Sequence, residues 1–198
     1  MTTESGTAGL PSHASRDYYT ALYNAALMIS SSLELDQVLQ SIVTSITEAM
    51  DVKACGLRLL DSQTGQLQVS VVHGLSGSYL AKGPVNVKQS SIDSEALQGK
   101  PVYVQDARSD PRFQYQKAAK EEGLVSILCV PLEVHGGAIG VMRVYTSELT
   151  TFDEEDVKFL SALASLSALA IENARLFESI KTSYEGVMSA FLGPSFQP

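Results

Sequence analysis

The chain has 198 residues, a length that holds one domain with a full-sized core and additional helix, but no second catalytic domain. Its formal net charge is −8 and its pI is near 4.8, so the phosphates of nucleic acid or of an anionic membrane would repel it. Its two cysteines, Cys55 and Cys129, lie far apart and outside any Cys-x-x-Cys pair, so no disulfide framework is predicted.

The first residues predict an unstructured tail. Residues 1–14 are rich in Ser, Thr, Gly and Ala, a composition typical of disorder. They contain neither the basic residues nor the apolar core of a signal peptide. The rest of the sequence has no uninterrupted apolar run of membrane-spanning length. We therefore expect a cytoplasmic protein.

Two amphipathic helices are predicted after the tail, because apolar residues recur at steps of three and four. The run Ser30-Ser31-Ser32 predicts a joint between them. The periodic residues are Tyr19, Leu22, Ala26, Ile29 and Leu33 in the first helix, and Leu35, Val38, Leu39, Ile42, Ile46 and Met50 in the second.

The next segment predicts a β-hairpin followed by short pieces. Residues 52–60 and 67–73 have the composition of strands, and the connecting Asp61 to Gly65 suits a type I turn closed by a left-handed residue. From residue 74 to 122 the pattern is broken, and such segments often cover a sheet and carry the site. The pieces expected there are a turn, an extended stretch at 85–87, a helix near 92–97, a strand near 102–104 and a helix near 114–122.

A second hairpin and a long helix complete the chain. Two apolar, β-branched-rich runs, 123–132 and 138–145, flank the turn His135-Gly136-Gly137. The helix is predicted to begin either with a capping box of Thr151 and Glu154 or with Asp153 as the cap.

The long helix carries an apolar stripe with the alternating four and three steps of a coiled-coil seam. Gly186 weakens this helix by about 1 kcal/mol relative to Ala, and Gly193-Pro194 ends it. The first half of the stripe is expected to pack on the domain's own sheet, and the half beyond Phe177 on a partner helix. The stripe consists of Phe159, Leu163, Leu166, Ala170, Asn173, Phe177, Ile180, Tyr184, Val187 and Phe191.

Several blocks of the sequence stand in the order and spacing of one family. They are residues 54–75, 82–85, 99–106, 110–113, 123–145 and 170–176. Through them the chain resembles the GAF domain family over roughly residues 16 to 180. The resemblance implies an α+β fold and a sensory or regulatory role.

In that fold a central antiparallel sheet of about five to six strands has the terminal helices on one face. Short helices and loops cover the other face, and the expected ligand pocket lies beneath them. The expected division of the chain is a tail at 1–14, the GAF-like domain at 15–180, and a helical extension with a tail at 181–198.

Two arginines, Arg58 and Arg143, interrupt otherwise apolar strands that are neighbours in a GAF-like sheet. We predict that they share one face of it. Two buried guanidinium groups need carboxylates or an anionic ligand beside them, and Arg recognises carboxylate and phosphate by paired hydrogen bonds. The alternative is an internal salt bridge, with the candidate partners Glu133, Asp106, Asp110 and Glu48.

Three further residues are predicted at the pocket entrance, since the connecting segments form its lid in this resemblance. They are Lys82, Arg112 and Tyr115. No metal is predicted, because no two of the histidines have the spacing of metal ligands, and a structural or surface role is expected for His73. The residues leave the identity of a cofactor open.

Three more specialised roles known in this family are considered: cyclic-nucleotide binding, covalent attachment of a bilin and redox chemistry by cysteines. Val157 and Thr146-Ser147 replace parts of the motif of cyclic-nucleotide-binding members, and residues 74–122 contain no Cys to attach a bilin. Cys55 and Cys129 are expected to be buried and unreactive, since nothing basic lies beside either one in sequence to lower its pKa.

The sequence thus predicts a non-enzymatic sensory module that binds a small molecule of unidentified nature and signals through its terminal helices. The alternatives are a dimerisation or partner-docking scaffold without a ligand and, third, a cysteine-dependent oxidoreductase. The expected partners are a second copy of the chain and a signalling protein. The residues predicted at the homodimer interface are Tyr19, Leu22, Ile29, Phe177, Ile180, Tyr184, Val187 and Phe191.

Overall fold

The computed structural model describes residues 17–31 and 34–192, and side chains as far as residue 188. The predicted tail at 1–14, Leu33 and the side chain of Phe191 lie outside the described residues. The helices are α1 (Tyr18–Ser31), α2 (Leu35–Ala49), α3 (Gly77–Leu80), α4 (Ser91–Ala96), α5 (Gln116–Glu122) and α6 (Glu154–Leu192), with a 3₁₀ turn η1 (Val87–Gln89). The strands are β1 (Ala54–Asp61), β2 (Gln66–His73), β3 (Val85–Asn86), β4 (Val102–Val104), β5 (Ile127–Val134) and β6 (Gly137–Tyr145).

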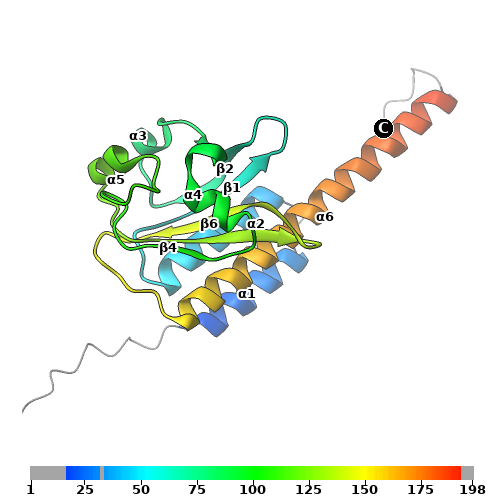
Figure 1. Cartoon of the computed structure of the whole chain (residues 1–198). Coiled ribbons are helices and arrows are strands. Elements are labelled where there is room, and N and C mark those ends of the chain that lie inside the picture. The colour runs from blue at the N-terminus through cyan, green and yellow to red at the C-terminus, as the bar shows by residue number, and fades with distance from the viewer. Residues whose placement is uncertain (1–16, 32–33, 193–198) are drawn as a thin grey trace, which may run out of the picture.

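The strands form one six-stranded antiparallel sheet in the order β3-β2-β1-β6-β5-β4. Both predicted hairpins are present, and β1 pairs with β6, so the first and last long strands lie side by side at the centre (Figure 1). The α+β fold predicted from the sequence is confirmed. The turn after β1 closes as expected on Gly65, whose φ of +66° favours glycine.

The terminal helices α1, α2 and α6 cover one face of the sheet (Figure 1). Small side chains at Ala21 and Ala25 are buried beneath α1, and the Tyr18 ring stacks on Phe159 of α6 with 4.0 Å between ring centroids. The Tyr18 hydroxyl also donates to the carboxylate of Asp156. These contacts fix α1 beside the start of α6.

The short elements α3, α4 and α5 belong to the opposite layer. Their apolar side chains and those of the sheet form a second core, which includes Tyr79, Ile92, Ala96 and Phe113. The sequence predicted only a turn where α3 forms, because a four-residue helix is too short to show a period. Its first turn is capped by Ser76, whose hydroxyl accepts a hydrogen bond from the Tyr79 amide at 3.2 Å.

Helix α6 begins with Asp153 as its cap, which decides between the two predicted starts. Its carboxylate accepts hydrogen bonds from the amides of Glu155 and Asp156 at 2.8 and 2.9 Å, and the Asp156 carboxylate accepts one from the Asp153 amide at 3.0 Å. This reciprocal arrangement satisfies amides at the helix start. Thr151 is therefore not the cap.

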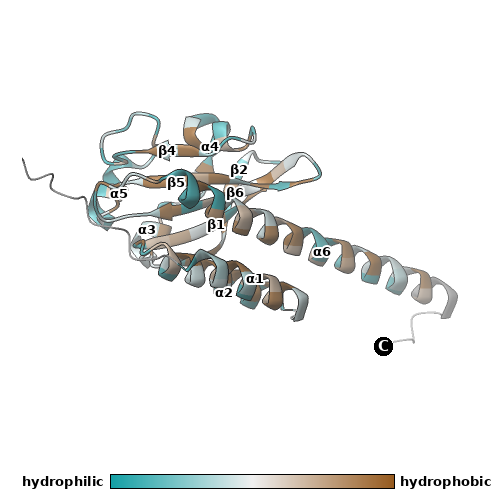
Figure 2. Cartoon of the chain, turned by 90° about the horizontal axis from the view of Figure 1, so that it is seen from below, coloured by the Kyte–Doolittle hydropathy of each residue, from teal (hydrophilic) through white to brown (hydrophobic). Residues whose placement is uncertain are grey.

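The second half of α6 leaves the domain and projects past the sheet (Figures 1 and 2). Leu163, Ala164, Ala168 and Ile171 are buried in the core, whereas the side chains from Arg175 to Val187 are exposed. By length and composition α6 could span a membrane over Glu154–Met188, but part of that stretch is packed inside the domain.

Candidate functional site

Arg58 and Arg143 lie on the same face of the sheet, the one that α3, α4 and α5 cover. Side chains alternate along a strand, so Arg58 shares its face with Ala54, and Arg143 shares its face with Val141 and Tyr145. Arg58 pairs with Val141 across β1 and β6, and Arg143 pairs with Gly56, which places the two arginines diagonally on adjacent strands. Only 4% of Arg58 and 3% of Arg143 are exposed.

Arg143 has a carboxylate partner, but a different one from the four considered in the sequence. Its Nη2 forms an ion pair with the Asp93 carboxylate of α4, and both side chains are buried. The other Asp93 oxygen accepts a hydrogen bond from the Ser90 hydroxyl at 2.6 Å. Burial acts to lower the pKa of Arg143, yet Asp93 and neighbouring groups hold it well above its usual value.

Arg58 has no such partner. Among the described residues no hydrogen bond or ion pair is made by its guanidinium group, and its Nη1 is completely buried. The hydroxyl of Tyr79 is also buried without a hydrogen-bond partner among these residues. Burial raises the pKa of that phenol, so it stays a neutral donor. A buried charge without a counter-ion is costly, and here it faces the same interior as Arg143.

Lys82 adds a third cationic group at the edge of this interior. Its Nζ lies 3.2 Å from the centroid of the Tyr79 ring and 5.4 Å from that of Tyr115, and it donates a hydrogen bond to the Tyr79 carbonyl at 3.1 Å. Burial first, and then repulsion from Arg58 and Arg143, lowers the pKa of Lys82 to about 7. Lys82 therefore changes its charge near neutral pH.

The other two predicted entrance residues are held by contacts within the chain. The Tyr115 hydroxyl donates to the Pro84 carbonyl at 2.9 Å, which keeps its ring beside Lys82. Arg112 instead forms paired hydrogen bonds with the Asp110 carboxylate, at 3.1 Å from Nε and 2.6 Å from Nη2. Its charge is thus already neutralised, unlike that of Arg58.

The two cysteines do not form a reactive pair. Cys55 belongs to the core beneath the terminal helices, and Cys129 belongs to the core on the opposite face of the sheet. Both are reduced and fully buried. Burial raises the pKa of the Cys129 thiol to about 12 and also raises that of Cys55. In the described part of the chain no group of three His, Cys, Asp or Glu side chains could hold a metal.

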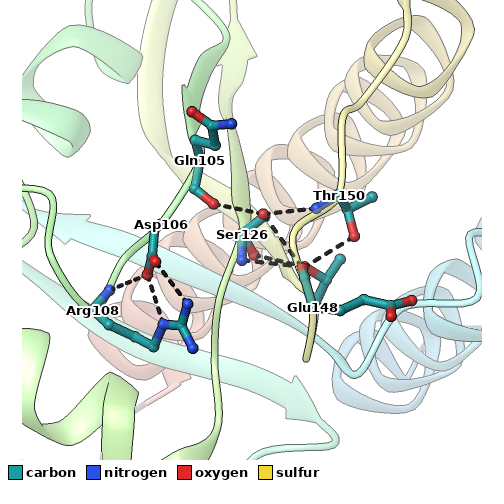
Figure 3. Close-up of polar contacts among 7 residues, drawn as sticks. Gln105, Asp106, Arg108, Ser126, Glu148 and Thr150 are labelled. Atoms are coloured by element: carbon teal, nitrogen blue, oxygen red, sulfur yellow. Dashed lines mark hydrogen bonds and ion pairs between the residues drawn. The ribbon is translucent and has the colours of Figure 1, made fainter.

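A polar network just before the start of β5 joins the site layer to the segment before α6 (Figure 3). The buried Ser126 hydroxyl donates to the Gln105 carbonyl at 2.7 Å and accepts from the Thr150 amide at 3.0 Å. Thr146 Oγ1 accepts from the Ser126 amide and donates to the Glu148 carbonyl at 2.7 Å. Residue 126 therefore links the end of β4 to the loop that leads into α6.

The predicted interface residues on α6 are exposed, and those on α1 are only partly so. Phe177 and Ile180 expose 62% and 69% of their surface, and Tyr184 and Val187 are exposed as well. On α1, Tyr19 is 80% exposed, but Leu22 and Ile29 pack partly against the domain's own core. The apolar surface that α1 presents to solvent consists of Tyr19, Tyr23 and Leu27.

A cavity of ≈ 670 Å³ lies where α6 leaves the domain. Its walls combine apolar side chains of three helices with the polar or acidic side chains of Glu34, Asp36, Asn173 and Glu178. The cavity thus lies beside the first exposed residues of the stripe. The lining residues include Ile29 of α1, Leu35 and Val38 of α2, and Ala170 and Phe177 of α6.

Sequence reasoning missed Asp93, Ser90 and Tyr79. Asp93 carries a recognisable signal, since it stands between Ile92 and Ala96 on the buried face of a predicted helix. A carboxylate in such a position needs a cation. Because residues 93 and 143 are far apart in sequence, only the folded chain identifies that cation.

Comparison with known proteins agrees with this architecture. A family model for the GAF domain matches residues 32–172. The methyl sulfide methyltransferase-associated sensor of Methanosarcina acetivorans is 28% identical over 162 residues, which are 78% of this chain and 16% of that protein. The chain spans 16–28% of the length of the curated relatives it matches.

Two solved structures share the fold. The GAF domain of a phosphoenolpyruvate-protein phosphotransferase from Coxiella burnetii has a TM-score of 0.74 and 23% identity, and the match covers 85% of this chain and 99% of that one. The free methionine-R-sulfoxide reductase of Neisseria meningitidis, solved in complex with its substrate, has a TM-score of 0.67 and 22% identity. That match covers 80% of this chain and 90% of the reductase.

Proposed function

Because the chain belongs to the GAF domain family, we propose that it is a non-enzymatic sensory module of the cytoplasm that binds a small molecule and signals through α6. GAF domains bind small molecules and occur in signalling proteins. The proposed binding site is the interior between the sheet and the layer of α3, α4 and α5.

The observation that carries ligand binding is the unbalanced positive charge in this interior. Two guanidinium groups are buried on one face of the sheet, and one carboxylate, that of Asp93, pairs with Arg143 alone. Buried charges are normally paired within the protein. A bound anionic group would supply the missing counter-charge for Arg58.

The output of the module is the projecting half of α6. Hydrophobic residues recur along this part of the helix (Figure 2), and the large ones are exposed. Burial of each would contribute about 1.5–3 kcal/mol. We expect a second copy of the chain to cover them. The cavity at the base of the projecting helix continues this surface onto α1 and α2.

The exposed residues of α6 favour a parallel dimer. Leu169, Asn173, Leu176, Ile180 and Val187 stand at successive intervals of four, three, four and seven residues. A single Asn among apolar seam positions specifies a two-stranded register, because two Asn side chains can pair across the axis. Rotation or shift of both helices would then transmit a change in the site.

The competing function is a dimerisation or docking scaffold without a ligand. It is favoured by the ion pair of Asp93, which already neutralises Arg143 and fills the space beside it. A cysteine-dependent oxidoreductase has no comparable support, since the two sulfurs lie in cores on opposite faces of the sheet.

Native mass spectrometry of the full chain, purified without denaturation from its own host, tests the proposal. We expect a dimer with an additional small acidic mass on each copy, and loss of that mass from the Arg58→Met variant. A dimer with no additional mass would favour the scaffold. A mass that both proteins retain would place the ligand elsewhere.

A further inference from the structure

Helix α4 occupies the position where an anion would meet Arg143. It is six residues long, and it contacts the sheet through the Asp93 ion pair and the buried side chains of Ile92 and Ala96. The Ser90 hydroxyl, just before the helix, fixes the free oxygen of Asp93 at 2.6 Å. The Asp93 carboxylate therefore has the charge, the burial and the hydrogen bonding of a ligand group.

The segment that carries Asp93 is suited to local opening. It lies between the 3₁₀ turn η1 and Gly99, whose φ is +85°, and α4 itself spans only six residues. At its two ends the amides of Ser94, Leu97, Gln98 and Gly99 donate hydrogen bonds to carbonyls three or four residues earlier. Release of α4 would uncover the three residues that it buries, Ile92, Asp93 and Ala96, and so requires a local opening and not global unfolding.

An external anion cannot reach Arg143 while Asp93 is in place. The arginine is 3% exposed and Asp93 is completely buried, so α4 seals this end of the interior. Arg58, on the adjacent strand of the same face, has an unpartnered Nη1. A compact anion between the two guanidinium groups would satisfy both, whereas Asp93 pairs with Arg143 alone.

We propose that the ligand carries one compact anionic group, a carboxylate or a phosphate, which displaces Asp93 from Arg143, bridges to Arg58 and so releases α4 from the sheet. This inference rests on the proposed function, since it concerns the same site. It makes Asp93 an internal competitor of the ligand. The apparent affinity of the wild type is then the intrinsic affinity multiplied by the fraction of molecules in which α4 is open.

The test uses the full chain with inorganic phosphate and, separately, acetate as probes. Affinity is measured by thermal shift or calorimetry against chloride of equal ionic strength. We expect Asp93→Asn to bind the preferred anion about tenfold more tightly than the wild type, because the internal competitor is gone. The preference between phosphate and acetate distinguishes the two sources of the anionic group.

Two further variants of the chain complete the test, one that weakens the hold on Asp93 and one that serves as a control. Ser90→Ala retains every charge but loosens Asp93, so its affinity should rise in the same direction by about two- to fivefold. Asp106→Asn is the matched control, because Asp106 forms its ion pair with Arg108 at the surface, 2.7 Å apart, and no change in affinity is expected.

Hydrogen exchange of the wild type reports the release itself. Saturating anion should speed exchange of the amides of Ser94, Leu97 and Gln98 while it slows exchange in β5 and β6. An Asp93→Asn affinity equal to or below that of the wild type, or α4 amides that the anion protects, would overturn the inference. If native mass spectrometry finds an uncharged ligand and neither anion binds, the inference fails while the proposed function stands.

Discussion

Arg58 and Arg143 have the same charge, the same burial and the same face of the sheet, yet their surroundings differ. Arg143 is compensated by Asp93, whereas Arg58 has no counter-ion among the described residues. Removing one partner of a buried ion pair is expensive, because the remaining charge stays desolvated, but removing an unpaired buried charge relieves that cost. The two arginines should therefore respond in opposite ways to the same substitution.

We expect Arg58→Met to raise the free energy of unfolding by about 1–3 kcal/mol, since Met fills similar space without a charge. Arg143→Met, the matched control, should lower it by about 3–5 kcal/mol, because Asp93 is left buried and unpaired. Urea denaturation of the three proteins in phosphate-free buffer measures both effects. Equal destabilisation by the two substitutions would show that Arg58 has a structural partner.

Lys82 predicts a dependence of stability on pH. Its pKa is about 7 in the folded chain, against 10.5 for an unperturbed lysine, so between these values the unfolded chain binds more protons. The free energy of unfolding should therefore gain a contribution from Lys82 as the pH rises from about 7 to about 10, and lose it as the pH falls.

The comparison with Lys82→Met isolates this contribution. The stability of the wild type minus that of the variant should increase across the same pH range, because other titrating groups are common to both proteins. Urea denaturation at several pH values gives the difference. A difference that stays constant with pH would mean that Lys82 keeps a normal pKa in the folded chain.

At the scale of elements, Ser126 connects the site layer to α6. Its hydroxyl is the donor to Gln105 and the acceptor from Thr150 (Figure 3). Ser126→Ala would leave both backbone groups unpaired, and we expect it to lower the free energy of unfolding by about 1–3 kcal/mol. Thr44→Ala is a control, since Thr44 is an outer residue of α2 that bonds only weakly to His73, at 3.4 Å, besides its own helix. If urea denaturation shows that Ser126→Ala and Thr44→Ala lower the free energy of unfolding equally, Ser126 does not have the linking role described here.

The projecting half of α6 predicts association. Sedimentation should find a dimer at micromolar concentration. The double variant Phe177→Glu with Ile180→Glu should be a monomer, because each helix would carry one carboxylate at the seam position 180 and another beside the seam at 177. Thr182→Glu adds a charge elsewhere on the exposed helix and should remain dimeric. A monomeric wild type in that concentration range would contradict the proposed dimer.

At the scale of the whole molecule, much of the architecture was predictable from sequence. The two hairpins and the terminal helices show their own periods over eight or more residues, and the short segments between 74 and 122 followed from the local pattern, except that only a turn was predicted where α3 forms. The shared face of Arg58 and Arg143 followed from the family resemblance, in which their two strands are neighbours. These features depend on local pattern and on the order of strands.

The site was less predictable, because it depends on contacts between distant short segments. The partner of Arg143 is Asp93, which lies in a six-residue helix, whereas the sequence offered four other carboxylates. Which face of α1 is buried also depends on a contact with a distant segment, and the sequence did not predict it. Ala21 and Ala25, rather than the larger Tyr19, turn toward the core, because α1 packs closely beside α6 and small side chains permit that distance.

The central claim is that the state of the site reaches the projecting helices of a dimer. Spin labels on Thr182→Cys report this directly, since Cys55 and Cys129 are fully buried and their thiol pKa values are raised. Electron-spin distance measurements on the labelled full chain, with and without saturating phosphate, compare two states of α6. Arg58→Met with the same label is the control.

We predict one distance distribution between the two helices that shifts when phosphate binds to the wild type, and that phosphate leaves unchanged in the Arg58→Met protein. The absence of any distance between two labels would contradict the dimer. An identical distribution with and without bound phosphate would contradict the transmission of a signal from the site to α6.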